Sequence, residues 1–319
     1  MRSHQLLRVV FVTGAIIVAL SYLGLSFLVV DLALRAVPNP VYDIPSDRGM
    51  EYREIEFPPR GQADVTLRGW WIPAKASRGT VIWVHGLHAN RSSALDMAEE
   101  LVIRGLSVLA FDLRGHGDSD EMPMGVGIHE KYDVEGAIDF LVGQHGVESG
   151  SLIIFGQSFG GASALLAAHD EKAVVGVFTD SAFAEVSDLM VKEVANLTPV
   201  PAWIALGLKP GLKLVSRLWK GVDLDKASPG DAASKFAYPI GLTHCMDDVR
   251  IPFSHAITIW DKGPPGGVFG PFEKCSEGQG GMNDGHAQGY QQFRDAYIEL
   301  LMQYVDMRLS AERPVPNGA

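Results

Sequence analysis

Residues 151–164 read SLIIFGQSFGGASA. The stretch starts with the apolar run Leu152 to Phe155, turns at Gly156-Gln157-Ser158-Phe159-Gly160, and continues into a run of small residues. A strand, a serine flanked by glycines and a helix in this order are typical of a nucleophile elbow. A turn this tight leaves no room for a side chain at Gly156 or Gly160. We therefore predict that the Ser158 hydroxyl is exposed at the carboxyl edge of a sheet, above a helix N-terminus that favours negative charge.

Short apolar segments alternate with helical segments on both sides of this turn. The predicted strands are 51–57 and 65–73, which form a hairpin, followed by 80–84, 106–111, 151–155, 174–178, 238–244 and 268–274. The predicted helices are 93–104, 130–144, 161–170, 252–260 and 290–309. Buried strands separated by helices require a mostly parallel sheet that is covered on both faces. The fold class is a doubly wound α/β protein.

The alternation stops after Phe183. Residues 184–236 are expected to form a helical lid inserted after the sixth strand. The lid mixes aromatic and basic residues, which could rest on an anionic membrane surface and collect lipid-like esters. Alternatively, its apolar face packs on the core. The residues concerned are Trp203, Lys209, Lys213, Arg217, Trp219 and Lys220.

The N-terminal segment differs from the rest of the chain. No residue from Val9 to Val30 is charged, and at ~1.5 Å per residue this run reaches about 33 Å, enough to cross a ~30 Å hydrocarbon layer. The run is longer than the apolar core of a cleaved secretory signal, so an uncleaved single-pass anchor is the better interpretation. Arg2 and Arg8 precede it and Asp31 follows it, which favours a cytoplasmic N-terminus and a globular domain on the extracytoplasmic side.

These features divide the chain into five parts. They are a tail (1–8), a transmembrane anchor (9–30), a linker (31–50), an α/β domain (51–310) and a C-terminal tail (311–319).

Composition excludes some classes of function. The chain has 319 residues and a formal net charge of −11, which argues against nucleic acid as a partner. His85 and His88 lack a suggested third metal ligand, and we expect no metal and no cofactor. Cys245 and Cys275 end two strands that we expect to be neighbours, so they either form a disulfide or remain two buried free thiols.

A serine hydroxyl becomes a good nucleophile only when a base removes its proton, so we expect an imidazole and a carboxylate downstream. His286 lies between the last strand and the closing helix. Asp248, which follows the strand at 238–244, is the predicted acid, and Asp247 is the alternative. Asp180, after an earlier strand, is interpreted as a structural turn residue. The backbone amides of Phe159 and Leu87 are the predicted oxyanion donors.

Together these residues resemble the α/β-hydrolase superfamily over about residues 50–310. The motifs are His85-Gly86, residues 112–119 (DLRGHGDS), residues 156–161, residues 248–252 and Gly285-His286. Within that superfamily the chain is similar to single-pass membrane hydrolases and to the lipase-like or serine aminopeptidase-like branch. One departure from the pattern is the long glycine-rich stretch before His286.

The resemblance implies a cofactor-free serine hydrolase that cleaves ester or thioester bonds, less often peptides, through an acyl-serine intermediate. An acyltransferase or a serine aminopeptidase with the same three residues is an alternative. A non-catalytic anchored binding protein is a further alternative, from a different class.

Overall fold

The computed structural model describes residues 2–36, 38–197, 206–277 and 284–311. The chain forms two compact units. One unit contains Met1–Arg35 and Val186–Lys226, and the other contains Ala36–Glu185 and Ala227–Ala319. The larger unit, which we call the α/β core, holds every strand described.

An eight-stranded sheet forms the centre of the α/β core, in the order β1-β2-β4-β3-β5-β6-β7-β8. Strand β2 runs antiparallel to both of its neighbours, and the remaining pairs are parallel. The strands are β1 (Arg53–Phe57), β2 (Leu67–Ile72), β3 (Thr80–Val84), β4 (Ser107–Phe111), β5 (Leu152–Gln157), β6 (Val174–Asp180), β7 (Gly241–Cys245) and β8 (Val268–Phe272). The predicted, mostly parallel doubly wound sheet is confirmed.

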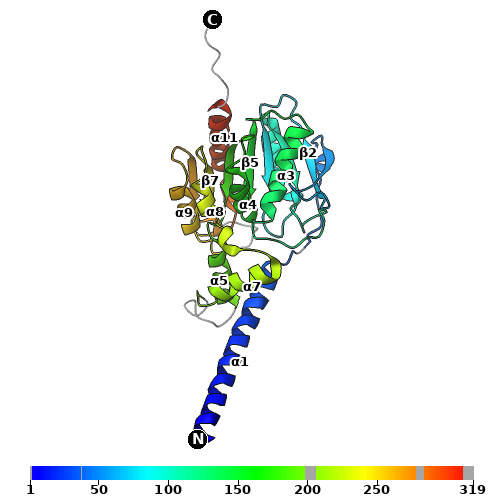
Figure 1. Cartoon of the computed structure of the whole chain (residues 1–319). Helices are drawn as coiled ribbons and strands as arrows, with labels where there is room; N and C mark the ends of the chain where they lie inside the picture. Colours follow the sequence, from blue (N-terminus) through cyan, green and yellow to red (C-terminus); the bar gives the residue numbers. More distant parts are fainter. Residues whose placement is uncertain (1, 37, 198–205, 278–283, 312–319) are drawn as a thin grey trace. The chain divides into compact units, whose positions relative to one another are not determined.

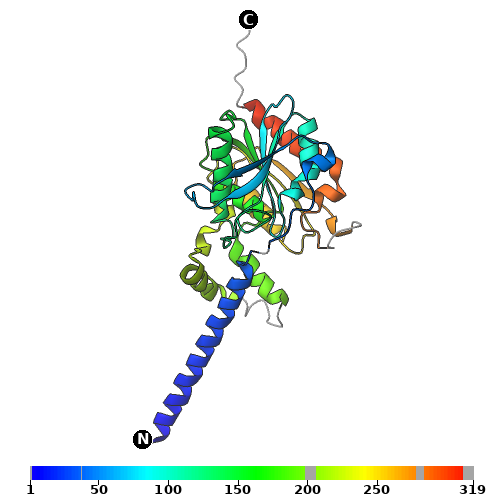
Figure 2. The ribbon, with the colours of Figure 1, turned by 90° about the vertical axis from the view of Figure 1, so that its right-hand side faces the viewer.

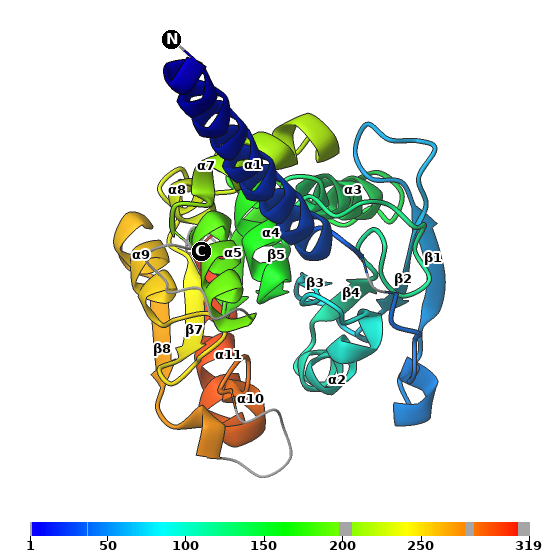
Figure 3. The same cartoon turned by 90° about the horizontal axis from the view of Figure 1, so that it is seen from below.

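Helices cover both faces of this sheet. The helices described in the α/β core are α2 (Leu95–Ile103), α3 (Glu130–Gly143), α4 (Phe159–Ala168), α8 (Pro229–Ala233), α9 (Ser254–Lys262), α10 (Gly289–Gln292) and α11 (Arg294–Ala311), with short 3₁₀ turns η1 (Pro45–Arg48), η2 (Arg91–Ala94) and η5 (Cys275–Glu277). In Figure 3, α2, α10 and α11 lie on one side of the sheet, and α3, α4 and α8 lie on the other. The closing helix predicted at 290–309 is interrupted at Phe293, which separates α10 from α11.

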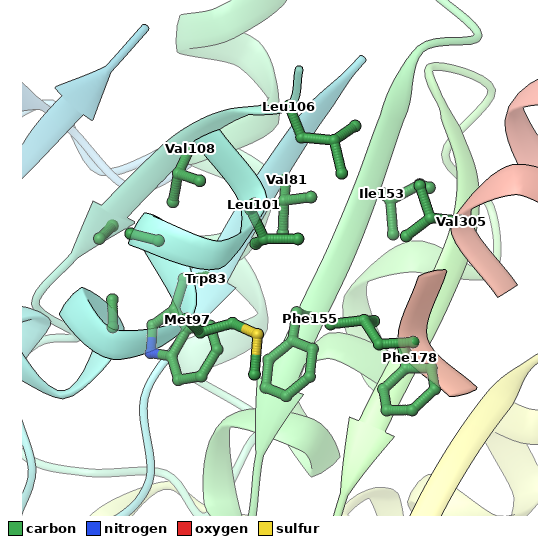
Figure 4. Packing of buried hydrophobic residues seen from close by; sticks show 14 of the residues in the cluster. Val81, Trp83, Met97, Leu101, Leu106, Val108, Ile153, Phe155, Phe178 and Val305 are labelled. Carbon is green, nitrogen blue, oxygen red and sulfur yellow. The ribbon is translucent and has the colours of Figure 1, made fainter. Parts of the chain in front are cut away.

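The main apolar core lies between the sheet and the pair α2 and α11. Trp83 stacks on Phe155 at 4.4 Å between ring centroids, and Phe155 stacks on Phe178 at 5.6 Å. Met97 and Leu101 from α2 pack against the same cluster, as does Val305 from α11 (Figure 4). Fully buried aromatic rings of this size stabilise the sheet by about 2 to 3 kcal/mol each, which fixes the strand ends that carry the candidate site.

The smaller unit is helical. It consists of α1 (Arg2–Ala33), α5 (Val186–Leu197), α7 (Lys209–Val215), the π-helical turn η3 (Ser216–Lys220) and η4 (Leu224–Lys226). We call the segment Val186–Lys226 the helical insertion. Trp203, which the sequence places in the lid, lies outside the described residues, as do the C-terminal tail beyond Ala311 and most of the glycine-rich stretch before His286.

Candidate active site

Ser158 lies between β5 and α4 in a strained conformation. Its backbone has φ 53° and ψ −118°, a region that non-glycine residues rarely occupy and that costs about 1 to 3 kcal/mol. The Ser158 amide donates to the carbonyl of Asp180 at the end of β6, 2.7 Å away. The neighbouring strand therefore holds the turn in place.

The two glycines around Ser158 are there because backbones approach closely. A Cβ atom added at Gly160 would lie 2.2 Å from the carbonyl oxygen of Val84, and one at Gly156 would lie 2.5 Å from that of Gly160. Both distances are far below van der Waals contact. The expectation that neither position has room for a side chain is confirmed.

Three of the predicted site residues form one hydrogen-bonded chain. Nε2 of His286 lies 2.8 Å from Oγ of Ser158, and its Nδ1 lies 2.7 Å from Oδ2 of Asp248. All three side chains are buried. Because the carboxylate accepts from Nδ1–H, the lone pair of Nε2 faces the serine hydroxyl, as a general base requires.

Asp248 is held as a charged acceptor. Its Oδ1 accepts from the amides of Arg250 and Ile251, each at 2.8 Å, while Nε2 of His244 lies 3.4 Å from Oδ2. Burial favours a higher pKa for Asp248, but the hydrogen bonds with His244 and His286 outweigh it and lower the pKa to about 2. The carboxylate is therefore ionised at neutral pH and can stabilise an imidazolium on His286.

Asp247, the alternative acid, bonds to different partners. Its carboxylate accepts from the amides of Cys275 and Ser276, at 3.0 and 2.9 Å, and from the Ser276 hydroxyl at 2.6 Å. The other carboxylate considered, Asp180, is buried and accepts from the hydroxyls of Ser181 and Tyr297. Neither side chain hydrogen-bonds to His286 among the contacts of the described residues.

The loop that carries Asp248 is joined to the loop that carries His286. Cys245 and Cys275 form a disulfide. The Val249 amide donates to the carbonyl of Asp284, and the Asp284 carboxylate accepts from the Arg250 guanidinium. These links fix the separation of the acid and the imidazole.

The predicted oxyanion donors lie on the two segments that border Ser158. Phe159 is the first residue of α4, and the first helical bond recorded there runs from Ala162 to the Ser158 carbonyl, so the Phe159 amide belongs to the unpaired first turn. A Cβ atom added at Gly86, the residue before Leu87, would lie 3.5 Å from Cβ of Ser158. The segments that carry the two predicted donors therefore border Ser158.

His85 and His116 are structural. Nδ1 of His85 donates to the Gly86 carbonyl, and its Nε2 accepts from the Leu113 amide at 3.0 Å. His116 likewise donates to the carbonyl of Arg114 and accepts weakly from the His88 amide. Burial lowers the pKa of each imidazole to about 4, so both stay neutral. No cluster of three or more candidate metal ligands occurs within the described parts of the chain.

Sequence reasoning missed two buried ion pairs beneath the site. Arg114 forms a bidentate pair with Asp133 in α3, with its closest contact at 2.6 Å. Arg91 pairs with Asp112 and also with Asp118. The charged residues of the 112–119 motif are the only sequence signal, since nothing local identifies their partners. These pairs anchor the loop after β4.

Residues 75–237, just over half of the chain, match the family model described as Serine aminopeptidase, S33. The chain belongs to this hydrolase family. Among curated relatives of this family member, the YfhR protein of Escherichia coli O157:H7 is 30% identical over 203 residues, which are 61% of this chain and 63% of that protein. The YqkD protein of Bacillus subtilis (strain 168) is 24% identical over 244 residues, 75% of each chain. The chain thus spans less than two thirds of the length of YfhR.

Solved structures similar to this S33 family member are α/β hydrolases. The esterase Pf2001 of Pyrococcus furiosus superposes with a TM-score of 0.68 at 20% identity, covering 86% of this chain and all of that chain. An α/β hydrolase from Vibrio vulnificus gives 0.57 at 19% identity, covering 80% of this chain and 82% of its own. The α/β-hydrolase fold and the superfamily membership expected from the sequence are confirmed.

Proposed function

We propose that this S33 family member is a serine hydrolase with Ser158 as nucleophile, His286 as base and Asp248 as acid. The observation that carries the proposal is the continuous chain of short hydrogen bonds from Ser158 through His286 to Asp248. A merely structural glycine turn would not require a strained serine facing an imidazole whose other nitrogen is held by an ionised carboxylate.

The reaction proceeds through two acyl transfers. His286 accepts the Ser158 proton as Oγ attacks the substrate carbonyl, and the amides of Phe159 and Leu87 stabilise the oxyanion. His286 then protonates the leaving group, which leaves an acyl-serine. Water, deprotonated by the same imidazole, releases the acid and restores Ser158. Asp248 stabilises the imidazolium in both steps.

A fluorophosphonate probe tests the nucleophile directly. We expect labelling of the detergent-solubilised chain and its complete loss in Ser158→Ala. Ser163→Ala is the matched control. Ser163 is buried like Ser158, but it lies within α4 and its hydroxyl donates to the Phe159 carbonyl, 2.9 Å away. Labelling that persists in Ser158→Ala would exclude Ser158, and absence of labelling in the folded native chain would exclude the proposed mechanism.

The proposed substrates are carboxylic esters or thioesters. The fold neighbour from Pyrococcus furiosus is described as an esterase, whereas the family description favours peptide substrates as a second candidate. p-Nitrophenyl esters of increasing chain length, assayed beside aminoacyl p-nitroanilides, separate the two. Added alcohols that divert the acyl group from water would identify an acyltransferase.

We further propose that α1 is an uncleaved membrane anchor. The segment His4–Ala33 has a mean hydropathy of 2.2 over its most apolar window, only 11% of which is buried. An anchor or a signal sequence meets this criterion, but Tyr22 of α1 hydrogen-bonds to the helical insertion, which favours a helix retained in the mature protein. The Cys245–Cys275 disulfide supports an oxidising, extracytoplasmic location for the α/β core. Retention in membranes after alkaline extraction and digestion by protease added outside cells test both points.

A further inference from the structure

The helical insertion is attached directly to α1. The Tyr22 hydroxyl donates to the carbonyl of Gly207 and accepts from the amide of Gly211, both at 2.8 Å. The second bond satisfies the Gly211 amide, because an amide in the first turn of α7 has no partner within that helix. Figures 1 and 2 both show α7 beside the C-terminal part of α1.

Helices α1 and α7 approach closely at Ser26 and Gly211, because both of these residues are small. A Cβ atom added at Gly211 would lie 2.3 Å from Oγ of Ser26, which itself donates to the Tyr22 carbonyl. Glycine and serine at a helix crossing are the residues that allow close packing in a lipid environment. The depth of α1 in a bilayer therefore determines the depth of α7.

The length of α1 places this contact within the acyl-chain region. If the hydrocarbon layer begins near Val9, where the uncharged run starts, a ~30 Å layer spans about 20 residues and ends near residue 29. Tyr22 then lies roughly 10 Å inside the layer. Interfacial helices bury their apolar faces about 5 to 10 Å into the bilayer, so the depth fits α7.

The surface of α7 and η3 has the composition that this depth requires. Leu214 and Leu218 are 49% and 77% exposed. Trp219 stacks on Phe27 of α1 at 3.8 Å between centroids, so the apolar surface of α1 continues onto η3. This surface is unpartnered within the described residues of the chain, and its continuity with the anchor indicates lipid as its occupant.

The basic side chains of α7 are paired with acidic ones, whereas Lys220 of η3 lies near the C-terminal end of α1. Lys209 pairs with Asp188 and Lys213 with Asp225, which reduces the cost of placing them near lipid. Lys220 lies 4.0 Å from the centre of the Trp219 ring and 3.5 Å from Asp31. Arg217 is exposed on the same segment and complements anionic headgroups, and tryptophan favours the same interface.

We infer that α7 and η3 form an interfacial helix, which inserts Leu214, Leu218 and Trp219 into the leaflet at the C-terminal end of α1. The inference rests on the proposed membrane anchor. It does not depend on the chemistry proposed for Ser158. The partner is a lipid bilayer with anionic headgroups.

The test places one environment-sensitive fluorophore at a time on the full-length chain in phosphatidylglycerol vesicles. The native cysteines are joined in a disulfide, so a new cysteine is the labelled site. The test position is Leu218→Cys. Val18→Cys, 70% exposed on α1, reports the anchor, and Ile103→Cys, 72% exposed on α2, is the aqueous control. Fluorophosphonate labelling of each variant shows that it is folded.

We expect the probe at position 218 to be quenched several-fold more by doxyl-labelled lipid than the probe at 103, and to be protected from iodide. Quenching at 18 but iodide access at 218 would overturn the inference and leave the anchor intact. Protection from both quenchers at 218 would indicate a protein cover, such as a second copy, and would also overturn it. No doxyl quenching at 18 would instead refute the anchor itself. Equal quenching at position 218 in phosphatidylcholine and phosphatidylglycerol vesicles would show that the segment has no preference for anionic headgroups.

Discussion

Nε2 of His286 lies 2.8 Å from Oγ of Ser158, across 128 residues of sequence. The contact joins a strained turn after β5 to a loop that follows the last strand. Each partner is fixed by its own neighbours: Ser158 by the carbonyl of Asp180, and His286 by Asp248. In the reaction proposed above, contacts of this kind reduce the reorganisation needed in the transition state.

The roles of the two adjacent aspartates can be separated by matched substitutions. We predict that Asp248→Asn lowers kcat by about 10⁴, because the amide no longer stabilises the imidazolium and favours the wrong tautomer. Asp247→Asn should instead lower the stability by about 1 to 3 kcal/mol through its bonds to Cys275 and Ser276, with kcat changed much less. Ester hydrolysis and chemical unfolding of both variants check this. The opposite order of the kcat effects would make Asp247 the acid.

Loss of the disulfide should loosen the two loops that carry Asp248 and His286. The bridge closes a sequence separation of 30 residues, and removing a loop constraint of this size costs about 3 to 4 kcal/mol. In a domain of this size we expect Tm to fall by roughly 6 to 16 °C in a Cys245→Ser/Cys275→Ser double variant. Scanning calorimetry measures the shift, and treatment of the native chain with reductant should reproduce it. An unchanged Tm would show that the hydrogen bonds alone hold the loops.

The turn at Ser158 should not accommodate even a methyl side chain at Gly160. In Gly160→Ala the new methyl group would overlap the Val84 carbonyl, so we predict a loss of at least ~3 kcal/mol and little soluble, active protein. Gly143→Ala is the control, because a Cβ atom there meets nothing within 4 Å. Expression and unfolding of the two variants provide the comparison. Native-like stability of Gly160→Ala would contradict the packing described at the turn.

His116 should make the fold sensitive to acid. Burial lowers its pKa to about 4, whereas an unfolded histidine has its ordinary value of 6.5. Its stabilising contribution is complete above pH 6.5 and is lost as the pH falls towards 4, because only the unfolded chain takes up the proton. The stability difference between the native chain and His116→Asn should therefore shrink by about 3 kcal/mol between about pH 7 and pH 4. Urea unfolding of both proteins measures it, and a difference that does not change with pH would show that His116 titrates normally.

The sequence predicts the fold well because its signals are local. Steric exclusion at Gly156 and Gly160 and the length of each apolar run depend on neighbouring residues alone. The strand predicted to start at Tyr238 in fact starts at Gly241, and Pro239, which lacks an amide hydrogen, precedes it. Such differences concern element ends, where local signals are weakest.

What the sequence leaves open depends on contacts between distant residues. Asp247 and Asp248 follow the same strand, so only the path of the turn decides which of them contacts His286. Cys245 can pair with Cys275 only if β7 and β8 are neighbouring parallel strands whose carboxyl ends lie side by side. Similarly, no local pattern indicates that Arg114 pairs with Asp133 or that Tyr22 bonds to Gly211, 189 residues away.

The Tyr22 hydroxyl also bears on how a water-soluble form of the enzyme should be made. Cutting the chain after Arg35 is the obvious route, but it would leave the first turn of α7 with an unpaired amide and strip Trp219 of its stacking partner Phe27. Rate constants measured on such a shortened protein would refer to a chain whose helical insertion has lost its contacts with α1. Kinetics should therefore be measured on a chain that retains α1, in detergent micelles or nanodiscs.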